Sequence, residues 1–271
     1  MSVAEKPAVL REGERITGDL EVIALLRRSR TFDVYDVFSD SRDCRCVAKL
    51  PRPDRADDER TRRRLRHEAR MLLSCTHPHL VRAYELHDEP VPVLVLETLS
   101  GETLEHALSC SGGPLPLADV ALLASHVCSA LHYLHGRGIV HLDLKPANIV
   151  VDLGRVKLLD LSIARAPGPV AAGTGSRRHM APEQARGGDV GPPADVWGAG
   201  CVLFHALTGR AAFGARPDGF EQLERRAEPL LPGPQLPRAI ASVVNAALDP
   251  RPEARPTVEE LADVLDGAIP G

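Results

Sequence analysis

Short apolar runs separated by charged turns fill the chain up to about residue 99, and this pattern predicts a strand-rich region. The runs that predict strands cover residues 20–26, 33–38, 46–49 and 91–97. Residues 60–75 depart from the pattern, because their apolar side chains recur at helical spacing while arginines occupy the other side. The apolar side of this predicted helix consists of Leu65, Ala69, Leu72 and Leu73. We therefore expect a small sheet accompanied by one helix.

Longer apolar periods follow Ser100 and Gly101, a pair that we interpret as a hinge. They predict helices over residues 117–135, 194–207, 220–227, 238–248 and 258–266. Two short strands, 149–152 and 156–159, are predicted on either side of a turn. Residues 164–178, rich in glycine, proline and alanine, predict a loop.

The order of these elements predicts an α+β fold, because a region of strands precedes a region of helices. The polar and aperiodic residues 1–19 are interpreted as an N-terminal tail. Residues 20–99 would form a strand-rich lobe with its hinge, and residues 100–268 would form a helical lobe. The two lobes together are expected to make one domain over residues 20–268.

Composition places few further limits on the function. The 271 residues are 44% hydrophobic and 26% charged with a net charge of −4, so nothing points to nucleic acid or an anionic membrane as a partner. On sequence alone we expect no segment to reach the ~20 apolar residues of a membrane span, and the N-terminus lacks a signal-peptide pattern, so we expect a cytoplasmic protein. The six cysteines form no metal-binding quartet, and we interpret them as reduced, mostly buried thiols.

The segment with the clearest chemistry is His141-Leu-Asp143-Leu-Lys145-Pro-Ala-Asn148. Asp143 can accept the proton of a hydroxyl, Lys145 can neutralise a phosphoryl oxygen, and Asn148 can hold Mg²⁺. This combination suits the transfer of a phosphoryl group from ATP to an alcohol. The segment resembles the catalytic loop of protein kinases, H-R-D-L-K-P-x-N, with leucine in place of arginine.

Further motifs between about residues 20 and 266 match the protein kinase family in order and spacing. The resemblance implies that Lys49 grips the α- and β-phosphates of ATP and pairs with Glu68. It also implies that Asp160 matches the D-F-G aspartate and binds Mg²⁺, with Mn²⁺ as an alternative, together with Asn148. The presence of Lys145 beside the base favours serine and threonine over tyrosine as the accepting residues.

Three supporting features strengthen the resemblance without taking part in the chemistry. Glu183, in Met-Ala-Pro-Glu, and Arg255 match residues that form a structural ion pair in the family. Asp195 matches the anchor of the catalytic-loop backbone. Small-molecule phosphotransferases of the wider fold generally lack this set, so the resemblance favours a kinase that acts on proteins.

The resemblance further implies where the nucleotide binds. Leu96 would line the back of an adenine pocket, and Glu97 to Leu99 would form the hinge beside it. The residues implied in nucleotide binding are Arg27, Ser29, Val34, Val47, Lys49, Leu96, Glu97, Leu99 and Val150.

The glycine-rich loop of the family is missing, because its three glycine positions fall on Arg27, Ser29 and Phe32. Each charge-assisted hydrogen bond lost between backbone amides and phosphates would cost up to about 1.5–3 kcal/mol. Arg27, Arg28 and Arg30 would either offset this loss with positive charge or form a solvated turn, and the sequence favours neither reading. Phe32 is also compatible with the aromatic tip position of the family, shifted by one residue.

Leu142 replaces the arginine that receives a phosphorylated activation loop in many kinases. We therefore expect activity that does not depend on phosphorylation of Thr174 or Ser176. Ser176 also matches the family's substrate-facing hydroxyl. The basic helix 60–70 is either a docking surface for a regulatory partner or a solvated helix face, and the solvated face is favoured.

Two functions remain in competition. The first is an ATP- and Mg²⁺-dependent serine/threonine protein kinase, with protein substrates as partners and Asp143 as the base. The second is a pseudokinase that binds nucleotide weakly or not at all and acts through a partner surface. The six polar residues of catalysis are all present, which favours the active kinase: Lys49, Glu68, Asp143, Lys145, Asn148 and Asp160.

Overall fold

The computed structural model describes residues 9–152, 154–214, 216 and 218–267. These residues divide into two compact units. Unit 1 comprises the described residues up to Thr76 together with Val81–Leu99. Unit 2 comprises His77–Leu80 and the described residues from Ser100 onwards.

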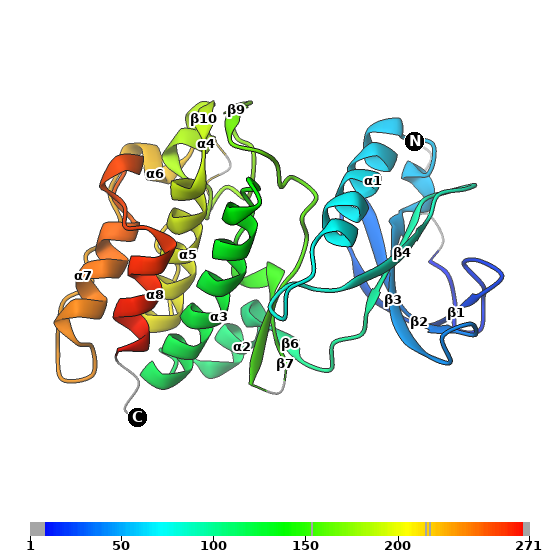
Figure 1. Cartoon of the computed structure of the whole chain (residues 1–271), viewed down its shortest axis with the longest axis horizontal. Coiled ribbons are helices and arrows are strands. Elements are labelled where there is room, and N and C mark those ends of the chain that lie inside the picture. The colour runs from blue at the N-terminus through cyan, green and yellow to red at the C-terminus, as the bar shows by residue number, and fades with distance from the viewer. Residues whose placement is uncertain (1–8, 153, 215, 217, 268–271) are drawn as a thin grey trace, which may run out of the picture. The chain divides into compact units, whose positions relative to one another are not determined.

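Unit 1 is built on a five-stranded antiparallel sheet with the strand order β1-β2-β3-β5-β4 (Figure 1). The strands are β1 (Leu20–Arg28), β2 (Phe32–Ser39), β3 (Cys44–Pro51), β4 (Ala83–His87) and β5 (Val93–Glu97). Each of the four predicted strands is present, and β3 extends beyond its predicted bounds at both ends. Strand β4 lies outside the predicted strands, because all five of its residues are half-buried and no alternation marks them.

The register of the sheet separates its two faces. One face packs into a core of Leu20, Val22, Tyr35, Val37, Cys46, Ala48, Val93 and Val95. On the other face, Val34 is opposite Lys49, and Val47 is opposite Leu96. Since directly opposed residues of an antiparallel pair point to the same side, these four residues share one face.

Helix α1 (Glu59–Ser74) begins at Asp58, whose side chain accepts a hydrogen bond from the Arg60 N–H. Its buried residues recur at helical spacing: Thr61, Leu65, Glu68, Ala69 and Leu72. The prediction for Leu73 is wrong, because this side chain is 46% exposed. Successive helical residues are about 100° apart, so Leu73 lies outside the stripe that contains Leu72.

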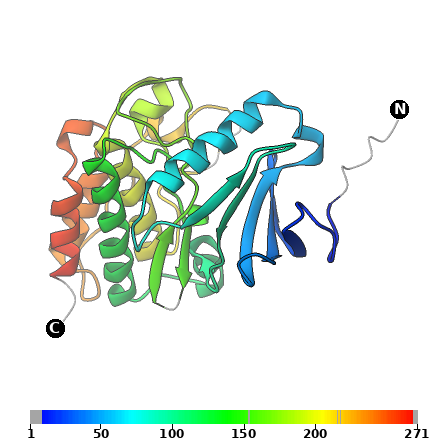
Figure 2. The same ribbon diagram turned by 45° about the vertical axis from the view of Figure 1, so that its right-hand side comes forward.

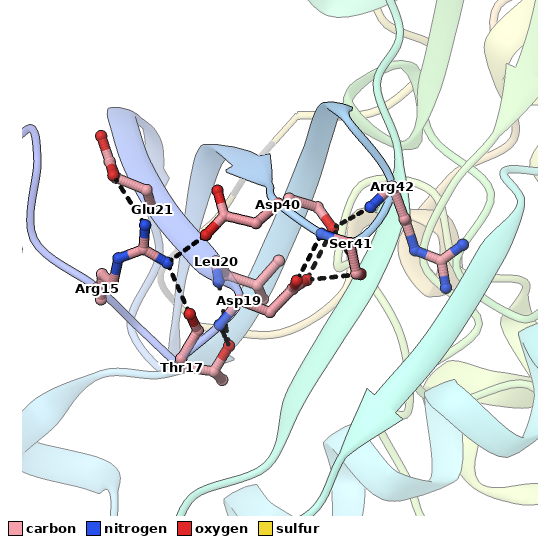
Figure 3. A network of polar contacts seen from close by, with 10 residues as sticks. Arg15, Thr17, Asp19, Leu20, Glu21, Asp40, Ser41 and Arg42 are labelled. Atoms are coloured by element: carbon pink, nitrogen blue, oxygen red, sulfur yellow. Dashed lines mark hydrogen bonds and ion pairs between the residues drawn. The ribbon is translucent and has the colours of Figure 1, made fainter.

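Residues 9–19 are not a free tail, because they bond to the first strand. The Gly13 N–H donates to Val22 O, and the Ile16 N–H donates to Leu20 O, both at 2.9 Å. Figure 3 shows how Arg15 reaches Asp40 at 2.7 Å and how Asp19 accepts a hydrogen bond from the Ser41 N–H, also at 2.7 Å. The first eight residues of the predicted tail lie outside the described residues.

Unit 2 is mainly helical. Its helices are α2 (Leu104–Ser111), α3 (Leu117–Gly136), α4 (Pro182–Arg186), α5 (Pro192–Thr208), α6 (Glu221–Glu224), α7 (Arg238–Ala247) and α8 (Val258–Asp266). Figures 1 and 2 show α3 beside α8 and α5, and α7 against α5 and α8. This group of four helices supplies most of the core of the unit.

Helix α3 corrects one expectation from the sequence. With 20 residues and a mean hydropathy of 1.4 in its most apolar stretch, it is long and apolar enough to cross a membrane. Nine of its residues are nevertheless buried within unit 2, where it packs between α5 and α8. Its apolar character is accounted for by this position in a protein core.

The smaller elements of unit 2 differ most from the prediction. A three-stranded sheet joins β6 (Glu102–Thr103), β7 (Ile149–Asp152) and β8 (Arg155–Leu158). Within the predicted loop 164–178, strand β9 (Gly168–Val170) pairs with β10 (Gly188–Val190). The predicted helix 220–227 shortens to the four residues of α6, because Arg225 is extended and its guanidinium bonds to Ala212 O.

Candidate active site

The predicted catalytic loop is fixed by one buried carboxylate from helix α5. Asp195 is 1% exposed and accepts hydrogen bonds from the His141 and Leu142 N–H groups, each at 2.8 Å. His135 Nε2 lies 2.8 Å from the same carboxylate. The position of Asp195 in the first turn of α5 suits a negative charge, because the amide dipoles there are directed toward it.

Leu142 has a φ of 65°, in the left-handed region that costs a residue with a Cβ about 1–2 kcal/mol. Both of its backbone groups are held, since its carbonyl accepts a hydrogen bond from Gln184 Nε2 at 2.8 Å. The same Gln184 nitrogen lies 2.9 Å from Thr174 O. Gln184 thus links the catalytic loop to the segment that carries Ser176, a role that the sequence analysis missed.

Three polar side chains meet at the Asp143 carboxylate. The Ser176 hydroxyl donates to Asp143 Oδ1 at 2.6 Å, and Lys145 Nζ donates to Asp143 Oδ2 at 2.8 Å. Lys145 Nζ also lies 2.6 Å from Ser176 Oγ, which closes a triangle. Asn148 Nδ2 donates to Asp143 O at 3.0 Å and to Oδ2 at 3.1 Å. The Ser176 hydroxyl is therefore hydrogen-bonded to the nearly buried Asp143 carboxylate, and the Lys145 ammonium lies beside the hydroxyl oxygen.

Asp160 is brought near Asn148 by the β7–β8 hairpin. The Leu159 N–H, one residue before Asp160, donates to Asn148 O at 2.8 Å. Asp160 has a φ of 60°, and its Oδ1 accepts a hydrogen bond from the Ser162 N–H at 3.1 Å. Since the Asn148 amide nitrogen is directed at Asp143, its amide oxygen is the atom that it can offer to a cation.

The described residues contain no group of three or more histidine, cysteine, aspartate or glutamate side chains that could hold a metal. A cation at Asn148 and Asp160 would therefore need further oxygen ligands from water or substrate. Mg²⁺ is usually bound in this way, with few protein ligands and several waters or phosphate oxygens.

Lys49 and Glu68 form a buried ion pair within unit 1. Lys49 Nζ lies 2.8 Å from Oε1 and 2.7 Å from Oε2 of Glu68, and the two side chains are only 11% and 1% exposed. Breaking such a pair is costly, because the remaining charge stays buried without compensation. The ammonium lies on the same sheet face as Val34, Val47 and Leu96.

The remaining residues implied in nucleotide binding lie in both units. Glu97 ends strand β5, where its N–H donates to Arg82 O at 2.9 Å, and Leu99 follows it at the end of unit 1. Val150 lies on β7 in unit 2, opposite Lys157. The structure therefore groups the predicted residues into two sets, one in each unit.

The turn between β1 and β2 consists of Ser29, Arg30 and Thr31, and hydrogen bonds close it. The Ser29 N–H donates to Phe32 O at 2.8 Å. The Ser29 hydroxyl oxygen accepts from the Thr31 N–H at 3.1 Å and from the Phe32 N–H at 2.8 Å. Three backbone amides of the region that replaces the glycine-rich loop are thus bonded within the hairpin.

The arginines of this hairpin differ in their roles. Arg28 makes a bidentate ion pair with Asp33, at 2.8 and 2.7 Å, and Asp33 is 1% exposed. Arg27 and Arg30 are exposed. The predicted turn at 27–30 is therefore shifted, because Arg27 and Arg28 belong to strand β1.

Arg255 ties three segments of unit 2 together. Its guanidinium donates to Glu183 at 2.7 and 2.9 Å, to Pro193 O at 2.8 Å and to Asp249 O at 2.9 Å. Its side chain is 0% exposed and lies over the Trp197 ring at 5.1 Å. The ion pair expected from the sequence is present.

His179 is a partly buried group near the catalytic loop. Burial, followed by the positive charges of Arg178 and Lys145, lowers the pKa of His179 to about 4. The side chain is therefore neutral at physiological pH.

The basic helix α1 is largely matched by acidic and carbonyl groups of unit 1. Arg66 lies 2.6 Å from Asp88, and Arg62 donates to Pro90 O at 2.8 Å. Arg63 lies 3.7 Å from Glu59 within the helix itself. These contacts support the reading of the arginines as a solvated helix face.

Comparison with known proteins agrees with the motifs. The protein kinase domain family matches residues 30–264. The probable serine/threonine-protein kinase SCO3848 of Streptomyces coelicolor is 30% identical over 97% of this chain and 42% of its own length. Serine/threonine-protein kinase PknB of Mycobacterium leprae is 34% identical over 77% of this chain and 36% of its own length. Serine/threonine-protein kinase PrkC of Bacillus subtilis is 33% identical over 74% and 32%.

The chain therefore spans about a third to two fifths of the length of these bacterial relatives. The family match covers the β-sheet of unit 1 from the hairpin onwards and nearly all of unit 2. On these grounds the chain belongs to the protein kinase domain family, within its bacterial serine/threonine branch.

Proposed function

We propose that this protein transfers the γ-phosphoryl group of ATP to serine or threonine hydroxyls of protein substrates. The observation that carries the proposal is the contact of an alcohol, Ser176, with both Asp143 and Lys145. It supports a site in which a hydroxyl faces a base on one side and a cation on the other. The names of the bacterial relatives support serine and threonine as the accepting residues.

While the Ser176 hydroxyl keeps Asp143 and Lys145 together, the substrate alcohol enters the proposed reaction at the same carboxylate. Its oxygen forms a bond to the γ-phosphorus while the bond from that phosphorus to the β,γ-bridging oxygen breaks, and ADP leaves. The hydroxyl proton passes to Asp143. Lys145 stabilises the negative charge on the transferring group, because its ammonium lies beside the reacting oxygen.

Unit 1 would supply most of the nucleotide contacts. Lys49, held by Glu68, would bind the α- and β-phosphates. Val34, Val47 and Leu96 would pack against adenine from the same sheet face. The backbone of residues 97–99 would hydrogen-bond the base, with Val150 of unit 2 as a further apolar contact.

Asn148 and Asp160 fit a hard cation such as Mg²⁺, and also Mn²⁺, because both offer oxygen ligands and water or phosphate can complete the shell. When bound, the ion would neutralise phosphate charge. The role of Asn148 and Asp160 would be to hold this ion. The hairpin contact fixes Asp160 next to Asn148, and Asp143 orients the Asn148 amide.

Residues 20–268 are proposed to form one kinase domain, preceded by the segment 1–19. We propose a cytoplasmic domain with protein substrates and without nucleic acid or membrane as a partner. A regulatory partner at the basic helix 60–70 remains a prediction, which charge reversal at Arg63 would test through a pull-down of partners.

The proposal is tested by incubating the chain with γ-labelled ATP, Mg²⁺ or Mn²⁺ and a generic protein substrate. We expect label on serine or threonine after acid hydrolysis, and loss of label in EDTA. The Lys49→Met variant should lose most of the transfer, because its phosphate-binding cation is gone. Label that appears on tyrosine alone, or none with either metal, would contradict the proposal.

One observation favours the second candidate, a pseudokinase scaffold. The amides of Ser29, Thr31 and Phe32 donate within the hairpin, so fewer are available to phosphates. The two candidates separate in a single experiment, because a scaffold would be stabilised thermally by MgATP, or not at all, without any transfer of label.

A further inference from the structure

Phe32 lies on the sheet face of the proposed phosphate-binding lysine. Phe32 and Val34 are two residues apart on β2, so their side chains point to the same side. Val34 is directly opposite Lys49 on β3. The sheet therefore places the Phe32 ring next to the Lys49 ammonium.

The ring and the ammonium are in contact. Lys49 Nζ lies over the Phe32 ring, 5.1 Å from its centroid, within the range of a cation–π interaction. The guanidinium of Arg64, on helix α1, lies 5.9 Å from the same centroid. Phe32 is only 5% exposed, so its ring is packed in unit 1 and not displayed at the tip of the hairpin.

The backbone beneath the ring is fixed in the same arrangement. Both backbone groups of Phe32 bond to Ser29, through its N–H at 2.8 Å and its carbonyl at 2.8 Å. The next residue, Asp33, is locked by its bidentate ion pair with Arg28. The hairpin holds the Phe32 Cα close to Lys49, so only the side chain can move away without breaking these contacts.

We propose that Phe32 is an aromatic lid on Lys49, which must turn outward before nucleotide phosphates can bind there. The proposal rests on the proposed function, in which Lys49 binds phosphates. A glycine at this position would leave space above the Lys49 ammonium. The Phe32 ring fills that space and makes a cation–π interaction with the ammonium. The lid opposes the binding of phosphates at Lys49, whereas the adenine contacts are proposed at other residues of this face, Val34, Val47 and Leu96.

This distinction gives the lid a signature that separates it from a purely structural role. Removal of the ring strengthens the binding of MgATP and MgADP, because their phosphates no longer compete with it. Adenosine has no phosphate, so its affinity changes little. A ring that only fills the core of unit 1 would alter the two affinities alike, or lower both.

The test is calorimetric titration of the whole chain with MgATP and with adenosine. We expect Phe32→Gly to bind MgATP about tenfold more tightly than the native chain, with adenosine changed by less than about twofold. Phe32→Leu, which keeps an apolar side chain but removes the π-face, should show part of this gain. If the glycine variant is poorly folded, Phe32→Leu still tests the proposal.

Phe38→Gly is the matched control, since Phe38 is on the same strand and face but opposite Arg45. It should leave the ratio of the MgATP and adenosine affinities unchanged. Equal or weaker MgATP binding by folded Phe32→Gly and Phe32→Leu overturns the lid, as does an equal gain for adenosine. The KM for ATP in label transfer distinguishes the two failures: transfer with an unchanged KM in these variants refutes the lid alone, whereas absence of transfer in every variant refutes the proposed function.

Discussion

At the scale of single residues, the arrangement around Asp143 depends on hydrogen bonds that cross from one segment to another. Ser176 comes from the segment before α4, while Lys145 and Asn148 come from the same loop as Asp143. Leu142 is held in a left-handed conformation next to the base by Asp195 and Gln184. The orientation of Asp143, the proposed base, is therefore set by residues that have no proposed part in the reaction.

Ser176→Ala removes the hydroxyl that joins Asp143 to Lys145. We expect kcat to fall about 10- to 100-fold with the KM for ATP nearly unchanged, because positioning and not nucleotide binding is lost. Ser176→Thr should restore most of the rate. Steady-state kinetics with a serine peptide measure both quantities.

Thr174→Ala is the control for this prediction, since the Thr174 hydroxyl donates to Ala171 O at 2.7 Å and lies outside the triangle. It should keep a near-native rate, consistent with activity that does not need loop phosphorylation. A large loss in Thr174→Ala, together with phosphate found on Thr174 in the active native protein, would contradict that view.

The sequence predicts the polar residues of the site, because their chemistry and spacing are local to short motifs. Gln184 and Phe32 could not be assigned in this way. Gln184 acts through two carbonyls far from it in the sequence, 42 and 10 residues away. The contact of Phe32 with Lys49 depends on the register of β2 with β3, which no single motif encodes.

At the scale of elements, Arg255 connects α4, the start of α5 and the chain before α8. Arg255→Ala would leave Glu183 partly buried without its partner and would remove three further contacts, to the carbonyls of Pro193, Asp249 and Pro250. We expect a loss of about 3–5 kcal/mol in the free energy of unfolding. Urea denaturation followed by circular dichroism measures it.

Arg210→Ala provides the comparison, because the Arg210–Glu228 pair has side chains that are 64% and 61% exposed. Exposed ion pairs contribute little, so this variant should change stability by no more than about 0.5 kcal/mol. Similar losses in the two variants would show that burial of the Arg255 pair is not what stabilises unit 2.

Periodicity predicts helices α1, α3, α5, α7 and α8 and strands β1, β2, β3 and β5, since these elements carry clear apolar patterns, whereas β4 carries none. The short elements escape it. Strands β9 and β10 pair three residues each across 18 to 22 positions of sequence, and α6 is a single turn whose neighbours are held by side-chain contacts. Such elements form because tertiary contacts favour them, and local propensity adds little.

At the scale of the whole molecule, partly buried histidines make stability depend on pH. Burial lowers the pKa of His77, His126, His179 and His205, and that of His179 falls to about 4. Between pH 6.5 and pH 4 the unfolded chain binds protons at these positions that the folded chain does not. The contribution of these histidines to the free energy of unfolding is therefore complete above about pH 6.5 and decreases as the pH is lowered.

His179→Tyr isolates the largest of these effects. The native chain should lose about 2 kcal/mol more than the variant between pH 7.5 and pH 5, because only the native chain carries this depressed histidine pKa. Urea midpoints at pH 7.5, 6.5, 5.5 and 5.0 give the two slopes. Parallel slopes would mean that His179 titrates normally in the folded protein.

In the proposed mechanism the chemical step depends on Asp143, which receives the proton of the substrate alcohol. The most direct measurement is the rate of phosphoryl transfer to a serine peptide by Asp143→Asn at saturating MgATP, with thermal stabilisation by MgATP recorded on the same samples. We predict a rate about a thousandfold below native with the stabilisation retained, because the base is lost while the nucleotide contacts remain. A folded Asp143→Asn variant that transfers phosphate at a near-native rate would contradict the mechanism.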